Sequence, residues 1–456
     1  MQRNQEHSQN KSDSEEFSPA RIAYQLLAAE DEGRVCKDIP ESACNHQTTN
    51  FVTHVVSLAM TKSADGLINP KLVLSWILTH LGAPAYFVGL LVPIREAGAL
   101  LPQLFIAGFL RSLPRRKFAW ALGSLIQGLS ALGMALAAFT LEGKALGLAL
   151  VSLLALLALA RSLCSVSYKD VLGKTVSKSR RGTATGTASS LASGLVILFA
   201  LLLASGWVDK LTLVTLGLAL AGLLWLLATW LFLTLAEEAG ATEGGANPFT
   251  VAREHLSYLV TDRQLFWFIV TRGLLMATAL APPYMVALAA TDTESGFAGL
   301  GWLVLASSLA ALLSSRFWGR LADRSSRKVL MLCGACAGVA LLLTALARQS
   351  GVVNLPGVLP LLLFGLMIAY EGVRLGRSTH LVDMANAERR AAYTALSNTV
   401  IGLLLVLGGL FSVVANAYGE QVVLIIFAMM SGLAVLAGYQ LNEAQEEARE
   451  EVGDKA

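Results

Sequence analysis

The residues of this sequence most able to do chemistry are ionisable side chains inside long apolar segments. A charge there is costly unless it is paired or lines a water-filled path, so such residues are candidate functional sites by default. Together they could bind a charged solute and take up or release a proton. The candidates for transport and proton coupling are Asp65, Arg95, Glu96, Arg161, Arg272, Glu371 and Arg374.

Two apolar segments are interrupted at related positions. The stretch KSADGLINPK breaks the first segment around Asp65 and Pro70, and Pro282, 212 residues after Pro70, predicts an interruption of the seventh at APPY. Interrupted helices in corresponding halves point to the central site of a transporter. The alternative is that proline only bends these helices to fit their neighbours. The candidates for a substrate path are Lys62, Asn69 and Tyr284.

The second segment carries Arg95 and Glu96 near its middle. Adjacent helical residues point about 100° apart, so each needs a partner on another helix, and Asp65 is the expected partner of Arg95. A carboxylate at this depth could take up a proton near neutral pH, as a proton-coupled carrier requires. A static ion pair that fixes helix packing is an equally good interpretation.

Other charges lie in the seventh and tenth segments. Glu371 and Arg374 are three residues apart, so we expect them to share a helical face and to pair. We expect Arg377 at the cytoplasmic surface in a structural role. Arg272 lies about nine residues from the cytoplasmic end of its segment and could either serve the site or extend outward to water.

The elements that must position these residues are membrane helices. Hydrophobic residues make up 55% of the 456 positions, charged residues 15%, and the mean hydropathy is +0.59, as expected of a chain in a bilayer. A spanning helix needs about 20 apolar residues. Twelve segments qualify: 51–80, 85–110, 118–140, 145–168, 182–206, 211–236, 264–290, 297–318, 328–348, 356–377, 391–415 and 419–440.

These segments predict an all-α membrane protein with two six-helix bundles. The expected division is an N-terminal tail (1–50), a first bundle (51–236), an acidic linker (237–262), a second bundle (263–440) and an acidic tail (441–456). Alternate loops hold nearly all the Lys and Arg residues, and the intervening loops offer only Lys144, Lys210 and Arg348. Because short basic loops stay in the cytoplasm, we expect both termini to be cytoplasmic, in the plasma (inner) membrane.

The two halves carry repeated landmarks. The basic turn GFLRSLPRRK, beginning at Gly108, corresponds to GRLADRSSRK, beginning at Gly319, 211 residues later. The segment RRGTATGTASS from Arg180 corresponds to RRAAYTALSNT from Arg389, at an offset of 209. Two landmarks at nearly one offset indicate a duplicated unit, which is how many secondary transporters are built.

Over roughly residues 50–440 the chain resembles the major facilitator superfamily. The resemblance depends on the twelve-segment layout, the central linker and the loop signature G-x-L-A-D-R-x-G-R-K, which the second turn matches better than the first, where Ser112 replaces the acid. It implies a cytoplasmic latch, stronger in the second half, and a proton-coupling role for Arg161. The implied gate residues are Gly108, Arg116, Gly319, Asp323, Arg324 and Arg327.

Other classes of function find little support. Gly173-Lys174-Thr175 resembles the end of a phosphate loop but lacks the opening glycine and the preceding strand, and no catalytic motif is present, so we expect no enzyme. Metal and cofactor sites and nucleic-acid partners are not expected, and no oligomer is implied. We therefore predict a secondary transporter that moves a small anionic or zwitterionic solute by alternating access, with the proton as coupling ion. The alternatives are a transporter-like sensor or scaffold and a passive facilitator.

Overall fold

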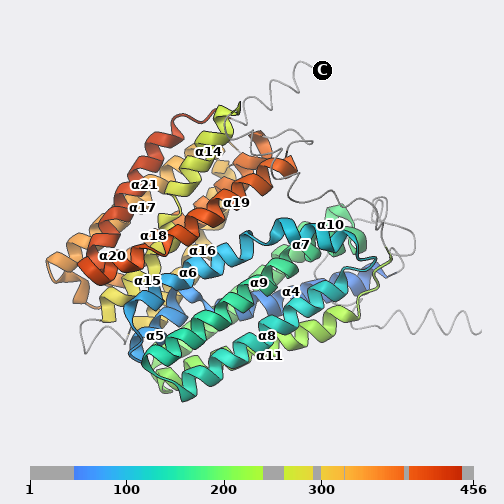
Figure 1. The fold of residues 1–456 in the computed structure, drawn as a ribbon, viewed down its shortest axis with the longest axis horizontal. Helices are drawn as coiled ribbons and strands as arrows, with labels where there is room; N and C mark the ends of the chain where they lie inside the picture. The colour runs from blue at the N-terminus through green and yellow to red at the C-terminus, as the bar shows by residue number, and fades with distance from the viewer. Residues whose placement is uncertain (1–45, 240–260, 291–298, 323, 385–389, 444–456) are drawn as a thin grey trace, which may run out of the picture.

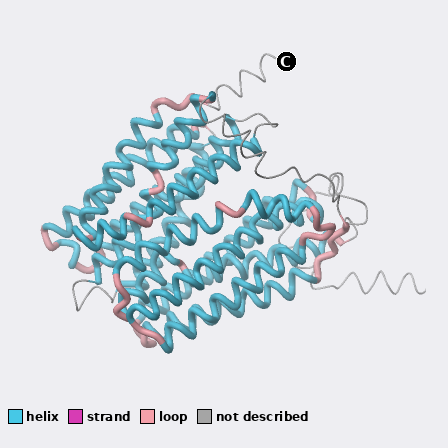
Figure 2. The backbone as a smooth tube through the Cα atoms, viewed as in Figure 1, coloured by secondary structure: helices cyan, strands magenta, loops and turns pink. Residues whose placement is uncertain are grey.

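The computed structural model describes residues 46–239, 261–290, 299–322, 324–384 and 390–443. These residues form helices joined by short loops, with no strand among them (Figure 2). The first 45 residues, most of the linker, Asp323 and the end of the acidic tail lie outside the described residues.

The N-terminal half supplies the first six spans. Three continuous pieces form the first span, two form the second, and each of the other four is one helix. The elements are α4 (Gln47–Ile68), η1 (Pro70–Leu74), α5 (Ser75–His80), α6 (Ala85–Leu100), α7 (Gln103–Arg111), α8 (Lys117–Thr140), α9 (Gly143–Thr175), α10 (Lys178–Ser205) and α11 (Lys210–Leu233).

The C-terminal half supplies the other six. Its first and fifth spans are each divided into two helices. The elements are α14 (Arg263–Leu274), α15 (Ala277–Ala290), α16 (Leu300–Ala322), α17 (Ser326–Gln349), η3 (Val352–Asn354), α18 (Val358–Met384), α19 (Arg390–Gly408), α20 (Phe411–Tyr418) and α21 (Glu420–Gly438).

The outer surface of this fold is apolar. Nine helical stretches of the described chain are long and apolar enough to cross a bilayer, and α4–α5, α6–α7 and α16 make up the remaining predicted spans. Large side chains such as Phe139 (82% exposed) and Trp230 (69%) face outward. An apolar exterior of this extent is soluble only in lipid, so the chain is a multi-pass integral membrane protein.

The predicted interruption of the first span is confirmed at Asn69 and Pro70. Lys62 and Asp65 lie inside α4, which continues to Ile68, so the prediction that they also occupy the break is wrong. Asn69 has φ 19° and ψ 90°, and the π-helix η1 begins directly afterwards at Pro70. The cause is local, because a residue that precedes proline is sterically disfavoured in the α conformation.

The seventh span is interrupted earlier than predicted. Pro282 and Pro283 lie within α15, so the expected break at APPY is wrong, and Leu275 and Met276 instead form the turn between α14 and α15. A proline ring removes one hydrogen bond and crowds the carbonyl four residues before it. For Pro282 that carbonyl belongs to Thr278, in the first turn of α15 directly after the break. Around the break the Met276, Thr278 and Ala279 N–H groups donate to carbonyls three residues earlier instead of four.

Two further breaks were not predicted. The second span turns at Leu101 and Pro102, and the eleventh turns at Gly409 and Leu410. Proline and a Gly-Gly pair are common causes of helix breaks, but the apolar pattern continues through both positions and hides them.

The two bundles converge at one end and separate toward the other. Figure 1 shows them meeting near α5, α15 and α20 and diverging toward the ends of α7 and α19 that carry the basic loops, which we call the basic-loop end. At the opposite end Gly301 of α16 lies directly against the Ala204 backbone of α10, and Gly89 of α6 lies against Ser412 of α20. Glycine permits these close approaches because a Cβ would clash at either position.

Candidate functional site

Asp65 is the centre of an ion-pair network within the N-terminal bundle. Its Oδ1 accepts a hydrogen bond from Arg95 Nη2 at 2.6 Å, and its Oδ2 pairs with Arg161. The Arg95 contact was expected from the sequence and is confirmed, whereas the Arg161 contact was not anticipated. One carboxylate therefore ties α4, α6 and α9 together.

The substrate-path candidates on the first span have local partners. Lys62 donates to the Ser189 hydroxyl on α10. The Asn69 side chain accepts from the Lys71 N–H at 3.2 Å and so begins the π-helix after the break. This geometry directs Lys71 across the interface, where its Nζ lies 3.3 Å from the centre of the Tyr370 ring on α18. Lys71 was not among the site residues predicted from the sequence, although the break just before it was predicted.

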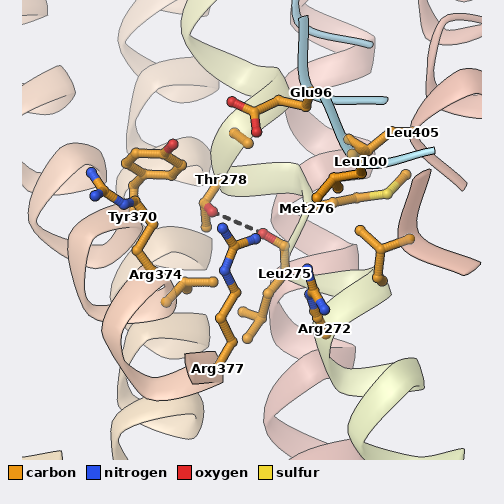
Figure 3. A pocket seen from close by; sticks show the side chains of 13 residues that line it. Glu96, Leu100, Arg272, Leu275, Met276, Thr278, Tyr370, Arg374, Arg377 and Leu405 are labelled. Atoms are coloured by element: carbon orange, nitrogen blue, oxygen red, sulfur yellow. Dashed lines mark hydrogen bonds between the residues drawn. The ribbon is translucent and has the colours of Figure 1, made fainter. Parts of the chain in front are cut away.

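A pocket lies between the bundles and is lined from both (Figure 3). It encloses about 460 Å³ of space between atoms, including its open side, and its walls come from α6, α14, α15, α18, α19 and the turn before α15. The lining combines charged and polar side chains with apolar ones. The lining residues are Glu96, Leu100, Arg272, Leu275, Met276, Thr278, Ala279, Tyr370, Val373, Arg374, Arg377, Ile401 and Leu405.

Arg272 does not extend outward to water. The residue is only 6% exposed and lines the pocket, where it donates to the Ser397 hydroxyl at 2.7 Å and to Asn398 Oδ1 at 3.0 Å. Its Nε has no hydrogen-bond partner among the described residues. A buried guanidinium held by neutral groups alone keeps its full positive charge facing the pocket.

The charged residues of α18 lie in or beside the same pocket. Glu371 and Arg374 form the expected ion pair at 3.2 Å, and the Arg374 side chain is 56% exposed although it lies deep in the bundle. Arg377 also lines the pocket, so its expected place at the surface is wrong. The three charges recur every third residue, and this spacing on one helical face was the available signal.

Tyr284 lies outside the pocket lining. It packs edge to face with Phe427 at 5.8 Å, and its hydroxyl, next to Gly89 of the other bundle, has no hydrogen-bond partner among the described residues. It belongs to the end at which the bundles converge.

The first basic turn is held by a buried carboxylate that follows α11. Glu237 accepts from the Arg116 N–H at 3.0 Å and the Lys117 N–H at 2.7 Å, and so caps the start of α8. Arg116 pairs with Asp170, which also pairs with Lys174 at 2.8 Å. Glu237 thus takes the capping role of the acid that Ser112 replaces in the first turn. The sequence of the turn itself does not predict this contact.

The second basic turn has a matching arrangement. Glu443, which follows α21, accepts from the Ser325 hydroxyl at 2.5 Å and lies 3.3 Å from Arg327. Arg327 also donates to the Leu441 carbonyl at 2.8 Å. Glu237 and Glu443 are 206 residues apart, close to the repeat offset, so each bundle ends in a carboxylate that holds its own basic turn.

The remaining gate candidates have fewer described contacts. Gly319 lies in α16, where an added Cβ would meet no other atom within 4 Å. Arg324 is exposed in the turn that follows, and Gly108 lies in α7. Asp323 lies outside the described residues, so its predicted capping role stays a prediction. Within the described residues, no group of three or more His, Cys, Asp or Glu could hold a metal ion.

An all-helical membrane protein with two six-helix bundles around a charged central pocket has the architecture of a secondary transporter. The sequence of residues 273–455 matches the family model of the Major Facilitator Superfamily. This match covers most of the C-terminal half of the chain, which is therefore similar in sequence to the major facilitator superfamily.

The fold is similar to solved transporters over most of their length. A mutant of the nucleoside transporter NupG has a TM-score of 0.65 at 14% identity, covering 85% of this chain and 98% of that one. A D-xylose-proton symporter has 0.64 at 12% identity, covering 86% and 98%. A POT family transporter in complex with 5-aminolevulinic acid has 0.66 at 10% identity, covering 85% and 95%. No curated protein sequence matches significantly.

Proposed function

We propose that this protein moves a small anionic or zwitterionic solute across the membrane by alternating access, coupled to protons. The observation that carries the proposal is the pocket between the bundles, into which Glu96 projects from one bundle and Arg272 and Arg377 from the other (Figure 3). A solute that contacts both bundles can couple their relative movement to its own binding, because it stabilises the arrangement it binds best.

The present arrangement corresponds to one state of such a cycle. Close approaches at the end opposite the basic loops join Gly301 to Ala204 and Gly89 to Ser412. Meanwhile Arg161 (38% exposed) and Arg374 (56%) remain accessible to water in mid-bundle. An opening of the pocket toward the basic-loop end accounts for both the close approaches at the opposite end and the exposure of these two arginines. If the basic loops are cytoplasmic, as their Lys and Arg content favours, the pocket is open to the cytoplasm of a plasma membrane.

Two observations support proton coupling. Asp65 and Glu96 are carboxylates in mid-membrane helices, where a titrating acid is costly to keep unless it has a function. The similar folds include a D-xylose-proton symporter and a transporter that binds 5-aminolevulinic acid, which carries both an amine and a carboxylate. A passive facilitator has no need of a titrating acid.

The test is reconstitution of the purified chain into liposomes with a pH-sensitive dye inside. A panel of anionic, zwitterionic and neutral solutes is added with and without an imposed pH gradient. We expect gradient-dependent accumulation of one solute class, which Glu96→Gln abolishes while some ligand binding remains. Empty liposomes control for leakage. Equilibration without accumulation would instead support a facilitator, and ligand binding with no flux would support a sensor.

A further inference from the structure

Two arginines in the pocket have no acidic partner in the described part of the chain. Arg272 is only 6% exposed, and it donates hydrogen bonds to Ser397 and Asn398. Its Nε has no hydrogen-bond partner among the described residues. Arg377 makes no ion pair or hydrogen bond among the described residues, and its guanidinium extends into the pocket beside Arg272 (Figure 3). Both residues belong to the C-terminal bundle, on α14 and α18.

Both guanidinium groups line the same pocket, and Figure 3 shows them side by side. Two like charges converging in a poorly hydrated pocket are unfavourable unless an anion neutralises them. The acid in the same pocket lining is Glu96 on α6. Its carboxylate makes no hydrogen bond or close ion pair among the described residues. Glu96 therefore offsets the positive charge of Arg272 and Arg377 from a distance and leaves their N–H groups available to a ligand.

We propose that Arg272 and Arg377 form an anion subsite for the carboxylate of a small organic acid, and that this carboxylate replaces Glu96 as their counter-charge, so that Glu96 takes up a proton when the acid binds. The inference rests on the transport function proposed above and names its substrate class. Planar guanidinium groups bind carboxylates through paired charge-assisted hydrogen bonds, and Arg272 Nε supplies a donor that is free.

The rest of the wall defines the body of the acid. Apolar side chains from α6, α15, α18, α19 and the turn before α15 line the same pocket as the arginines, and the acid would place its apolar body against them. They are Leu100, Leu275, Met276, Ala279, Val373, Ile401 and Leu405. A compact acid with one carboxylate and an apolar or aromatic body therefore fits this lining.

The charges around Glu96 explain why one substrate anion matters. Among the described residues, the charged groups around Glu96 are mostly cations, and the two nearby acids are already paired: Asp65 with Arg95 and Arg161, and Glu371 with Arg374. These cations are Lys71 of η1, Arg95 of α6, Arg161 of α9, Arg272 of α14, and Arg374 and Arg377 of α18. Adding an anion to this group weakens the positive field that favours an ionised Glu96.

Binding is tested on the full chain in lipid nanodiscs, with benzoate as probe and benzamide as its neutral isostere. We expect benzoate to raise the thermal unfolding temperature in a dose-dependent manner and benzamide to leave it unchanged. Arg272→Gln and Arg377→Gln should each weaken benzoate binding by about ten-fold or more. Arg320→Gln, an exposed arginine of α16 outside the pocket, is the matched control and should bind benzoate like the wild type.

Proton uptake is the second readout, and a purely structural role of the arginines would not produce it. Calorimetry in two buffers of different protonation enthalpy should show about one proton taken up per benzoate bound. Glu96→Gln should bind benzoate at least as tightly as the wild type and take up no proton. Arg272→Lys keeps the positive charge but loses the planar guanidinium group. An intermediate benzoate affinity in this variant would show that the weaker binding of Arg272→Gln is not caused by misfolding.

Several outcomes would overturn the subsite: equal stabilisation by benzamide, unchanged benzoate binding in both arginine variants, or no response to benzoate at all. Proton uptake that persists in Glu96→Gln would overturn the exchange. The transport function fails separately, if benzoate binds through the arginines but never crosses the reconstituted membrane. Conversely, accumulation of another solute that is insensitive to both arginine variants would leave transport standing and remove the anion subsite.

Discussion

Replacing Asp65 by asparagine tests whether the ion-pair network is mainly structural. The variant leaves Arg95, whose side chain is 12% exposed, without its counter-charge. Removing one partner of a buried pair costs about 3–5 kcal/mol, whereas a well-solvated pair contributes about 0–1 kcal/mol. Arg161 is 38% exposed and so adds little. Since asparagine retains one oxygen acceptor, we expect a loss near the lower limit, about 3 kcal/mol.

Glu96→Gln is the matched comparison on the neighbouring helix. Because Glu96 makes no hydrogen bond or close ion pair among the described residues, its amide should cost less stability than Asp65→Asn and remove only the longer-range balance of the pocket arginines. Denaturant titration of the purified wild type and both variants measures the difference. We expect Asp65→Asn to unfold at clearly lower denaturant and Glu96→Gln to unfold near the wild type, while both lose gradient-driven accumulation.

A double-mutant cycle makes the reasoning refutable. Asp65→Asn combined with Arg95→Gln should recover part of the lost stability, because the unpaired charge is removed as well. An Asp65→Asn variant as stable as the wild type would show that the network does not hold the bundle together. If both single variants accumulate solute normally under an imposed pH gradient, coupling through these carboxylates is wrong.

Three further predictions concern the loops. Glu237→Gln should destabilise the chain by about 1–3 kcal/mol in a denaturant titration, since it weakens the cap of α8. The control Glu238→Gln, at an exposed neighbour, should leave the stability unchanged, and equal losses in the two variants would contradict the capping role. Asp323→Asn should increase cytoplasmic accessibility of pore cysteines and Ser112→Ala should not; equal effects would contradict the asymmetry of the two turns. A single cysteine at Lys210 should react with an impermeant reagent from outside, and labelling only after permeabilisation would overturn the topology.

Much of the fold follows from the sequence because two strong signals fix it. Long apolar runs identify the spans, and the repeated basic turns identify the two halves; the observed helices begin and end close to the predicted limits except at α9 and α18, which extend into their loops. The breaks were harder to predict. Pro70 acts on the residue before it, whereas Pro282 lies within α15 and the observed turn falls at Leu275 and Met276, and hydropathy does not register either break.

The candidate site could be predicted in its residues but not in its pairings. The cost of burying a charge identifies Asp65, Glu96 and Arg272 without any structure. Which partner each one finds depends on helix rotation and crossing, which a single sequence does not specify. Asp65 thus has a second arginine that spacing does not indicate, and Arg377 is turned inward by the same helical face that carries Arg374.

The strength of contacts differs within and between the bundles, and this difference fits the proposed cycle. The strong ion pairs of Asp65 and the buried carboxylate Glu237 each lie within one bundle and need not break when the bundles move. Polar contacts that cross the interface include the Lys71–Tyr370 cation–π contact, a type that contributes about 0.5–2 kcal/mol, and an Asn398–Gln103 hydrogen bond at 3.5 Å. Because the crossing contacts are weak, the closed and open arrangements can lie within a few kcal/mol of each other. A ligand with modest preference for one of them is then sufficient to shift the balance.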